Sequence, residues 1–368
     1  MNAVGIAMMV SVVSVGVASA QPRLEVVGNP LAGTGFTPIG FAGGSNLLGI
    51  RAHADGGWEY AEATPTGVEV FDFAHIDPSR PRASRIRGDW FLLPGTDPTR
   101  RDHVIAATRD GGFNQAWSTQ QDSRYRWIGL GDGGEILGNK FTTAQNGSEG
   151  FAGVGLFETD GERFAPASDV RSADGILADG TVFVREPMLG ERAVFSFEMR
   201  TLKLIDVPYD IRTDIVVPFE SVSAHGVVLG DIDAVGSSST DSLYTHVDGV
   251  TTVLEFAPTV DRSELVDANR NGLAIGAYWD LTLADQNALD WSRSALWVDG
   301  ELFNFRDIIE LPDGVSAGGF LSLSDSNEIL ATVNTTEGAE FIVVRVVPGP
   351  GTAGLVVVAG LTASRRRR

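Results

Sequence analysis

The stretch "NRNGLAIG" at residues 269–276, followed by "SALWVDGELFNF" at residues 294–305, decides the fold. A turn sequence leads into three aliphatic residues and a glycine. An alternating strand sequence then runs into Asp299-Gly300, and a second strand sequence follows. Asp-Gly accepts the positive φ angles of a type I′ turn, so this second stretch predicts a tight β-hairpin. One such unit supplies an aliphatic inner strand and an outer hairpin.

The aliphatic pattern recurs along the chain, in one case as a degenerate copy, "RDHVIA" at residues 101–106. The other copies are "GSNLLG" (44–49), "GGEILG" (133–138), "DGILAD" (174–179), "HGVVLG" (225–230) and "SNEILA" (326–331). The ends of the seven copies have a mean spacing of 47 residues. This period matches a propeller blade, about 40–50 residues. The hairpin pattern recurs at Asp160-Gly161 and Asp248-Gly249.

These repeats predict an all-β chain and a seven-bladed β-propeller. Forty-four glycines and the near absence of amphipathic helical stretches agree with this fold class. A sheet of three or four strands cannot bury two faces alone, whereas radial stacking covers both. We expect the aliphatic trios at similar radius near the axis, and the segment Leu24–Val27 beside Phe341–Val347 to close the ring. A pair of β-sandwich domains is the alternative.

The two ends of the chain predict export. Residues 1–20 carry no charge, Val4 to Val17 is an apolar run, and Ala18-Ser19-Ala20 offers the small residues that a signal peptidase accepts. We therefore expect a signal peptide at 1–20, with Ala18 and Ala20 at the cleavage site and Gln21 as the mature start. The repeat domain then spans 21–347, and a short tail spans 348–368.

The tail has three parts: a proline-glycine segment (Pro348, Pro350, Gly351), an apolar stretch from Thr352 to Ala363, and four arginines. The apolar stretch is shorter than the ~20 residues of a helical span, and the arginines favour the cytoplasmic side. The tail resembles a PEP-CTERM sorting signal, with Gly349 where family tails have glutamate. The resemblance implies transient membrane contact, cleavage by an exosortase-type protease, and a secreted protein, extracellular or on the outer cell surface.

The repeats are also similar to HAF repeats, which run Asn-Asp-x-Gly-x-Val-Val-Gly and then through an aromatic strand to Asp-Gly. Residues 269–276 and 294–305 are the closest copy, with Ser294-Ala295-Leu296 at the place of the His-Ala-Phe triplet. Because that family has no agreed activity, the resemblance implies location and fold rather than chemistry.

The charge balance excludes one class of partner. The chain has 28 basic and 48 acidic residues, a net charge of −20, and loses four basic residues with the terminal arginines. Such a surface repels nucleic acid and attracts cations. The chain has no cysteine, and its length allows a sizeable core without disulfides.

No catalytic, cofactor or metal residues are assigned from the sequence. It lacks a Gly-x-Ser-x-Gly elbow, a His-Glu-x-x-His helix and a Walker loop. Of its five scattered histidines, His103 and His225 each begin an aliphatic strand and are interpreted as turn residues. In "DANRNG", Asp267, Asn269 and Asn271 alternate before a glycine, as in the first half of a calcium loop. The twelfth position is Tyr278, and a turn that opens a repeat is the favoured interpretation.

Tryptophans offer stacking surfaces for sugars. Trp297 lies in a strand and is expected in the core, while Trp279 and Trp291 flank the inserted segment Thr282–Asp290. Aromatic residues on an inserted loop are the better candidates for binding, as is a second insert at Val235–Asp241.

We therefore expect an acidic, exported propeller that binds or scaffolds in the exopolysaccharide matrix or at the cell surface, with polysaccharide as the candidate partner. The alternatives are a polysaccharide hydrolase or lyase and a purely structural surface-layer component. Carboxylates or histidines from several repeats, aimed at one end of the channel, would favour the enzyme.

The first prediction concerns processing. The mature chain should begin at Gln21 and lose its tail near Pro348–Gly351, because both ends carry the sorting features described above. Mass spectrometry of the extracellular form from native cells measures both ends. An intact "TASRRRR" peptide on that form would contradict the tail assignment and leave the signal peptide untouched.

Overall fold

The structure is a computed structural model that describes most of residues 21–347. The described residues are 21–28, 34–42, 44–52, 58–64, 67–71, 85–95, 97, 99–120, 122–144, 146–185, 188, 192–205, 220–232, 242–255, 260–280 and 292–347. Residues 1–20 and 348–368 lie outside them, so both sorting signals stay predictions.

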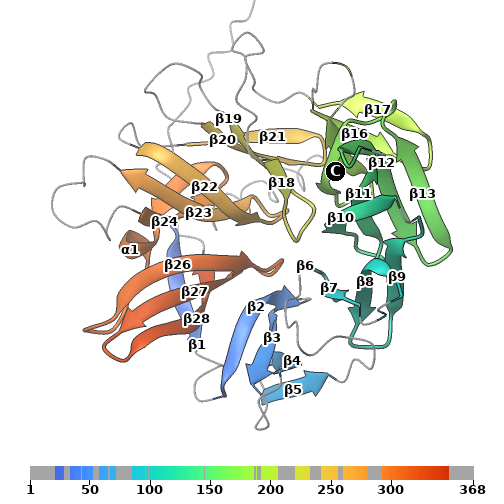
Figure 1. Cartoon of the computed structure of the whole chain (residues 1–368). Helices are drawn as coiled ribbons and strands as arrows, with labels where there is room; N and C mark the ends of the chain where they lie inside the picture. Colours follow the sequence, from blue (N-terminus) through green and yellow to red (C-terminus); the bar gives the residue numbers. More distant parts are fainter. Residues whose placement is uncertain are drawn as a thin grey trace, which may run out of the picture.

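The described chain forms seven antiparallel sheets of four strands each, arranged as the blades of a ring (Figure 1). Blade 1 comprises β2 (Phe36–Ala42), β3 (Asn46–Ala52), β4 (Trp58–Thr64) and β5 (Gly67–Phe71). Blade 2 comprises β6 (Arg85–Arg87), β7 (Trp90–Pro94), β8 (Arg101–Thr108) and β9 (Phe113–Ser118). Blade 3 comprises β10 (Ser123–Leu130), β11 (Ile136–Thr143), β12 (Glu149–Glu158) and β13 (Gly161–Pro166). Blade 4 comprises β14 (Ser172–Ile176), β15 (Val182–Arg185), β16 (Arg192–Ser196) and β17 (Thr201–Leu204).

The remaining blades follow the same order. Blade 5 comprises β18 (Glu220–Val222), β19 (Val228–Ile232), β20 (Ser242–Val247) and β21 (Val250–Leu254). Blade 6 comprises β22 (Val260–Ala268), β23 (Leu273–Asp280), β24 (Ser292–Val298) and β25 (Glu301–Asn304). Blade 7 comprises β26 (Ser316–Leu323), β27 (Glu328–Thr335), β28 (Gly338–Val347) and β1 (Arg23–Gly28). The predicted seven-bladed β-propeller is confirmed.

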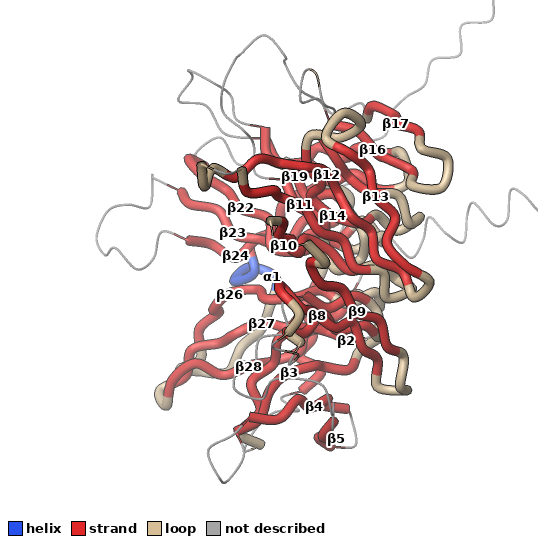
Figure 2. The backbone as a smooth tube through the Cα atoms, turned by 45° about the vertical axis from the view of Figure 1, so that its right-hand side comes forward, coloured by secondary structure: helices blue, strands red, loops and turns tan. Residues whose placement is uncertain are grey.

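Strands are the dominant element of the described chain, and most of the remainder is loops and turns (Figure 2). Its one helix in the described ranges, α1 (Phe305–Ile308), has four residues and begins at the cap Asn304. No helix within these ranges has the length and apolar character needed to cross a membrane.

The ring closes between the two ends of the domain. The N-terminal strand β1 is the outermost strand of blade 7 and runs antiparallel to β28, with Leu24 opposite Val346 and Val26 opposite Val344. In Figure 1 the blue strand β1 lies in the red sheet. The pairing of the first β segment with the last is therefore confirmed.

The core consists of seven apolar clusters, one between each pair of neighbouring blades. Adjacent residues of one strand serve different clusters: Leu47 packs toward blade 7 and Leu48 toward blade 2. A strand buried on both faces has apolar residues in succession instead of alternation. The aliphatic trio is the sequence signature of this double burial.

The expected position of the trios near the axis is wrong. In blades 1, 3, 5, 6 and 7 the trio lies on the second strand, while the first strand lines the axis. The copy at 101–106 falls on the third strand of blade 2, and the copy at 174–179 falls at the end of the first strand of blade 4. The second strand has the aliphatic run because both its faces are covered, whereas one edge of the first strand faces the channel.

Two of the three predicted Asp-Gly turns have the expected backbone. Asp248 and Gly249 have φ of 50° and 81°, and Asp299 and Gly300 have φ of 51° and 90°, as a type I′ turn requires. At the third hairpin Gly161 opens β13 and pairs with Glu158, so Thr159-Asp160 form the turn. The hairpin is confirmed there, but its centre lies one residue earlier than predicted.

Neighbouring first strands approach closely at the axis. A Cβ atom on Gly175 of β14 would lie 2.4 Å from Cβ of Val222 in β18. A Cβ on Gly40 of β2 would lie 3.2 Å from Oγ of Ser322 in β26. The glycines therefore allow the blades to converge.

The second prediction tests this convergence. Gly175→Ala should lower the free energy of unfolding by about 1–3 kcal/mol, because neither backbone can move away without disturbing a third blade. Urea denaturation measures the change. In the matched control Gly150→Ala the new Cβ meets nothing within 4 Å. The control should change stability by less than about 0.5 kcal/mol. Equal effects of the two variants would contradict the close approach at the axis.

Candidate functional site

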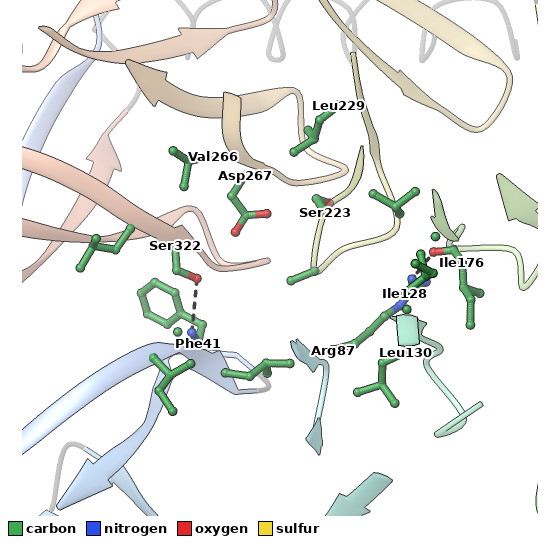
Figure 3. A pocket seen from close by; sticks show the side chains of 18 residues that line it. Phe41, Arg87, Ile128, Leu130, Ile176, Ser223, Leu229, Val266, Asp267 and Ser322 are labelled. Carbon is green, nitrogen blue, oxygen red and sulfur yellow. Dashed lines mark hydrogen bonds between the residues drawn. The ribbon is translucent and has the colours of Figure 1, made fainter. Parts of the chain in front are cut away.

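A cavity on the propeller axis is lined by residues of all seven blades. It has a volume of about 320 Å³ and is lined by the first strand of every blade (Figure 3). A cavity whose wall combines apolar side chains with polar groups is the first place to look for a ligand site. We therefore take it as the candidate functional site.

Recurrent β-bulges shape the cavity wall. Five first strands have a register shift at the corresponding place in the blade. In four of them the bulged residue is aliphatic and lines the cavity: Ile39, Ile128, Val266 and Leu321. A bulge re-aims a side chain, and here it turns aliphatic side chains toward the axis. Val266 and Leu321 stay 41% and 40% exposed, although they lie inside the ring.

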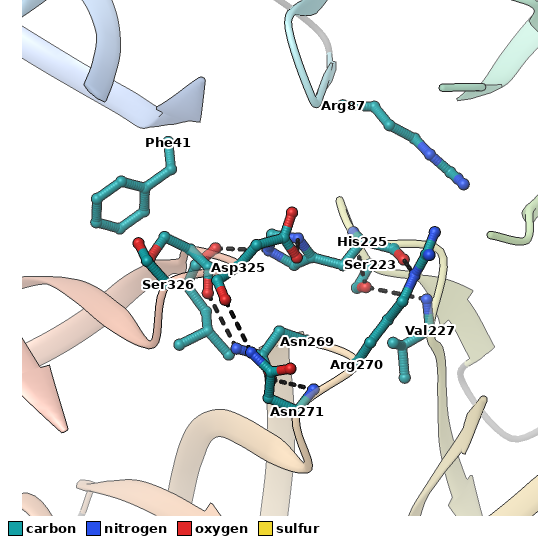
Figure 4. Close-up of polar contacts among 12 residues, drawn as sticks. Phe41, Arg87, Ser223, His225, Val227, Asn269, Arg270, Asn271, Asp325 and Ser326 are labelled. Carbon is teal, nitrogen blue, oxygen red and sulfur yellow. Dashed lines mark hydrogen bonds and ion pairs between the residues drawn. The ribbon is translucent and has the colours of Figure 1, made fainter. Parts of the chain in front are cut away.

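Polar residues gather at the end of the cavity where first and second strands are joined (Figure 4). Arg87 of blade 2 has a buried side chain that donates to Asp132 of blade 3 at 2.7 Å. It also donates to the carbonyls of Ile176 and Leu177 in blade 4. Asp132 in turn accepts from Arg270 of blade 6 at 3.3 Å. These contacts span the mouth of the channel from one side of the ring to the other.

His225 is the hub of this polar cluster. It lies in the turn between β18 and β19, and its Nδ1 is 2.8 Å from Oδ1 of Asp325 in blade 7. Its Nε2 lies 2.6 Å from the carbonyl oxygen of Leu323 and 4.0 Å from Oδ2 of Asp267. Both ring nitrogens face acceptors, and only the imidazolium form donates from both. The prediction that His225 is a turn residue is confirmed.

Burial by itself lowers the pKa of His225, but the hydrogen bond to Asp325 and the charges of Asp267 and Asp325 outweigh it. The pKa of His225 therefore lies above its ordinary value of 6.5. The hydrogen bond to His225 lowers the pKa of Asp325. Burial raises the pKa of Asp267, against the charge of His225 and the N–H donors of Leu323 and Ala268.

The residues "DANRNG" form the turn between β22 and β23 of blade 6, and their side chains contact blade 7. Oδ1 of Asn269 accepts the N–H groups of Asn271 and Leu273, while its Nδ2 donates to the carbonyl of Ser324. The two oxygens of Asp267 accept from backbone N–H groups. These oxygens accept hydrogen bonds from backbone N–H groups and do not converge on one point, as the ligands of a calcium ion would. The turn interpretation is confirmed, and in the described part of the chain no three acidic or histidine side chains are grouped as metal ligands.

The predictions for the positions of the tryptophans have different outcomes. Trp297 is fully buried, and its Nε1 donates to the carbonyl of Glu255 at 2.9 Å, so its assignment to the core is confirmed. Trp127 stacks on Tyr125 between blades 2 and 3, with 5.0 Å between ring centres. Trp291, both inserted segments and the side chain of Trp279 lie outside the described residues, so the loop surface stays a prediction.

Sequence reasoning missed the polar cluster, although a signal for it was present. Arg270, Asp132, His225 and Asp325 all stand two to four residues before an aliphatic trio. Because the trios occupy equivalent second strands, residues just before them meet at one end of the ring. Arg87 precedes β7, outside the recognised copies, and had no such signal.

No family model and no curated protein sequence matches the chain. Solved structures with similar folds are distant. A catalytically inactive virginiamycin B lyase from Staphylococcus aureus, solved with quinupristin, is 11% identical with a TM-score of 0.44, over 89% of this chain and 100% of that one. The β-propeller domain of the Trilobed protease from Pyrococcus furiosus is 12% identical with a TM-score of 0.46, over 76% and 86%. An uncharacterized protein from Listeria monocytogenes is 10% identical with a TM-score of 0.48, over 85% and 95%.

The third prediction concerns His225. Its folded-state pKa lies above the unfolded value near 6.5, so its contribution to stability is complete below pH 6.5 and is lost as the pH rises through the folded-state value. His225→Gln should therefore lower the free energy of unfolding by roughly 1–2 kcal/mol at pH 5.5 and by less at pH 9. The loss is modest because the side chain of Asp325 is exposed to water. Urea denaturation of both proteins at the two pH values measures this.

The control is His246→Gln. Burial and the charge of Lys203 lower the pKa of His246, so protonation of His246 destabilises the fold. The loss on replacing His246 should therefore be smaller at pH 5.5 than at pH 9, the opposite trend. If the two histidine variants showed the same pH trend, the charged state assigned to His225 would be wrong.

Proposed function

We propose that the protein works outside the cytoplasm as a rigid propeller that binds or scaffolds polysaccharide at the cell surface or in the exopolysaccharide matrix. A closed ring of sheets supports this proposal because it holds loops at both ends on a stiff frame, where binding residues are commonly found. The signal-like N-terminus, the PEP-CTERM-like tail and the net charge of −20 support export and a role in an aqueous, cation-rich matrix.

One observation favours binding over catalysis. The ionisable groups at the polar end of the cavity are hydrogen-bonded to other blades and not aimed at a shared empty point. Both ring nitrogens of His225 face acceptors on another blade, Asp325 and the carbonyl of Leu323, so the ring is engaged in contacts between blades. Arg87 is committed to Asp132 and to two backbone carbonyls. These side chains stabilise the ring.

A polysaccharide hydrolase or lyase is the second candidate, and the same cluster is the observation that favours it. Asp267, His225 and Asp325 come from three blades and meet at one end of the channel, the arrangement expected of an enzyme. The raised pKa of Asp267 would suit a proton donor. For this function the contacts between blades would have to open when substrate binds.

The fourth prediction distinguishes the two. The protein secreted by its native cells is mixed with the exopolysaccharide of the same cells, and the pelleted fraction and released reducing ends are measured. We expect co-sedimentation with the polymer and no release of reducing ends. Release that disappears in Asp267→Asn would establish the enzyme instead. The absence of both binding and release would contradict both candidates.

The same assay tests the inserted loop. The double change Trp279→Ala and Trp291→Ala should weaken co-sedimentation, since each stacking contact contributes about 0.5–1.5 kcal/mol beyond its buried area. The melting temperature should hardly change. The matched control is Trp297→Ala, which removes a fully buried indole. It should cost about 3–5 kcal/mol of stability. A comparable loss of stability in the double variant would show that those two indoles belong to the core.

A further inference from the structure

We propose that the axial cavity is a binding site for a small linear aliphatic amphiphile, whose alkyl chain enters between the bulged aliphatic residues of the first strands. This inference goes beyond the proposed function, because it concerns the channel and not the loops. It rests on the aliphatic side chains in the wall, on the polar contacts across one end and on the size of the cavity.

The wall presents aliphatic side chains from every blade. Ile86, Ile176 and Val222 line the cavity together with the four bulged residues Ile39, Ile128, Val266 and Leu321. Figure 3 shows Val266 on one side of the cavity and Ile128 and Ile176 on the other. Backbone groups of the first strands and the polar side chains of Arg87, Asp267 and Ser322 complete the wall. A ligand that matches this surface has a flexible apolar chain and a polar group.

The exposed aliphatic side chains are the second observation. Val266 and Leu321 remain about two-fifths exposed inside the ring, although a bulge in each strand turns them there. Apolar surface in contact with water is unfavourable, and concave apolar surface of this kind marks ligand sites. An alkyl chain in the cavity would remove this surface from water.

The two ends of the channel differ. At one end Arg87, Asp132 and Arg270 form a continuous set of contacts across the ring. At the other end the first strands begin. A chain would therefore enter from the end with the strand starts and leave its polar group near that mouth, in contact with water.

The dimensions select a slender ligand. A volume of about 320 Å³ stands at the lower end of the range for small-molecule pockets, about 300–1,000 Å³. Gly40, Gly129 and Gly175 line the cavity, and a Cβ on Gly175 would already meet the next blade. Branched or ring-shaped molecules are therefore poorer ligands than a linear chain.

The fifth prediction uses 1-alkanols of increasing length as probes, titrated into the full domain by calorimetry. Affinity should rise about three- to fourfold for each added methylene, as for burial of apolar surface. It should level off once the chain fills the cavity. Val266→Trp and Leu321→Trp should each lower the affinity for the best alkanol more than tenfold, because either indole would fill the cavity.

The matched control is Val250→Trp. Val250 is 61% exposed on the outer strand β21, so the same change there adds an indole without touching the channel. Its affinity should equal that of the wild type. Melting curves verify that each variant is folded, and a second channel variant keeps the test valid if one fails. Lack of saturable binding, a rise in affinity without a length limit, or equal losses in all three variants would overturn the proposal. Polysaccharide co-sedimentation would be unaffected by any of these results.

Discussion

The pairing of β1 with β28 is the constraint on which the rest of the structure depends. Each sheet is covered on both faces only if it has two neighbours, and seven clusters between blades require a closed ring. The N-terminal strand supplies the last strand of blade 7, so unfolding the first blade also exposes the seventh. Leu24 is 2% exposed against this blade and bridges to Ile309, while Arg23 pairs with Glu310 at the surface. The strand at the beginning of the domain thereby holds its end in place.

Closure also determines the axis. Seven first strands must converge, and glycine is used where a side chain would meet the next blade, as at Gly175. The bulges then turn aliphatic side chains into the remaining space, while the turns after these strands bring His225, Asp325 and Arg270 together from three blades. The aliphatic residues of the cavity wall and the polar cluster at its end therefore both follow from the convergence of the first strands. The polar cluster also connects blades that are not neighbours, since Arg87 of blade 2 donates to a backbone carbonyl of blade 4.

Much of the fold was predictable because double burial leaves a local mark. Three aliphatic residues in succession, as at Leu273–Ile275, reflect two neighbouring blades, and Asp299-Gly300 encodes a turn in two residues. The errors arose where that mark is ambiguous. Residues 101–106 and 174–179 show the same aliphatic pattern but lie on other strands of their blades. The pattern occurs there because the third strand and the end of the first strand are also buried. The polar cluster was not predicted, because its contacts join residues as far apart as Asp132 and Arg270, and only the closed ring relates them. The bulges that shape the cavity wall depend on register, which no single strand specifies.

The most informative feature of the molecule is therefore an axial cavity with aliphatic side chains from every blade, a polar cluster at one end, and two exposed aliphatic side chains, Val266 and Leu321. A crystal structure of the protein with 1-octanol tests this account most directly. We predict a continuous alkyl chain on the axis, within about 4 Å of Ile128, Val266 and Leu321, with its hydroxyl toward the mouth where the first strands begin. Ordered water alone along the axis, with the alcohol bound elsewhere or absent, would contradict the account.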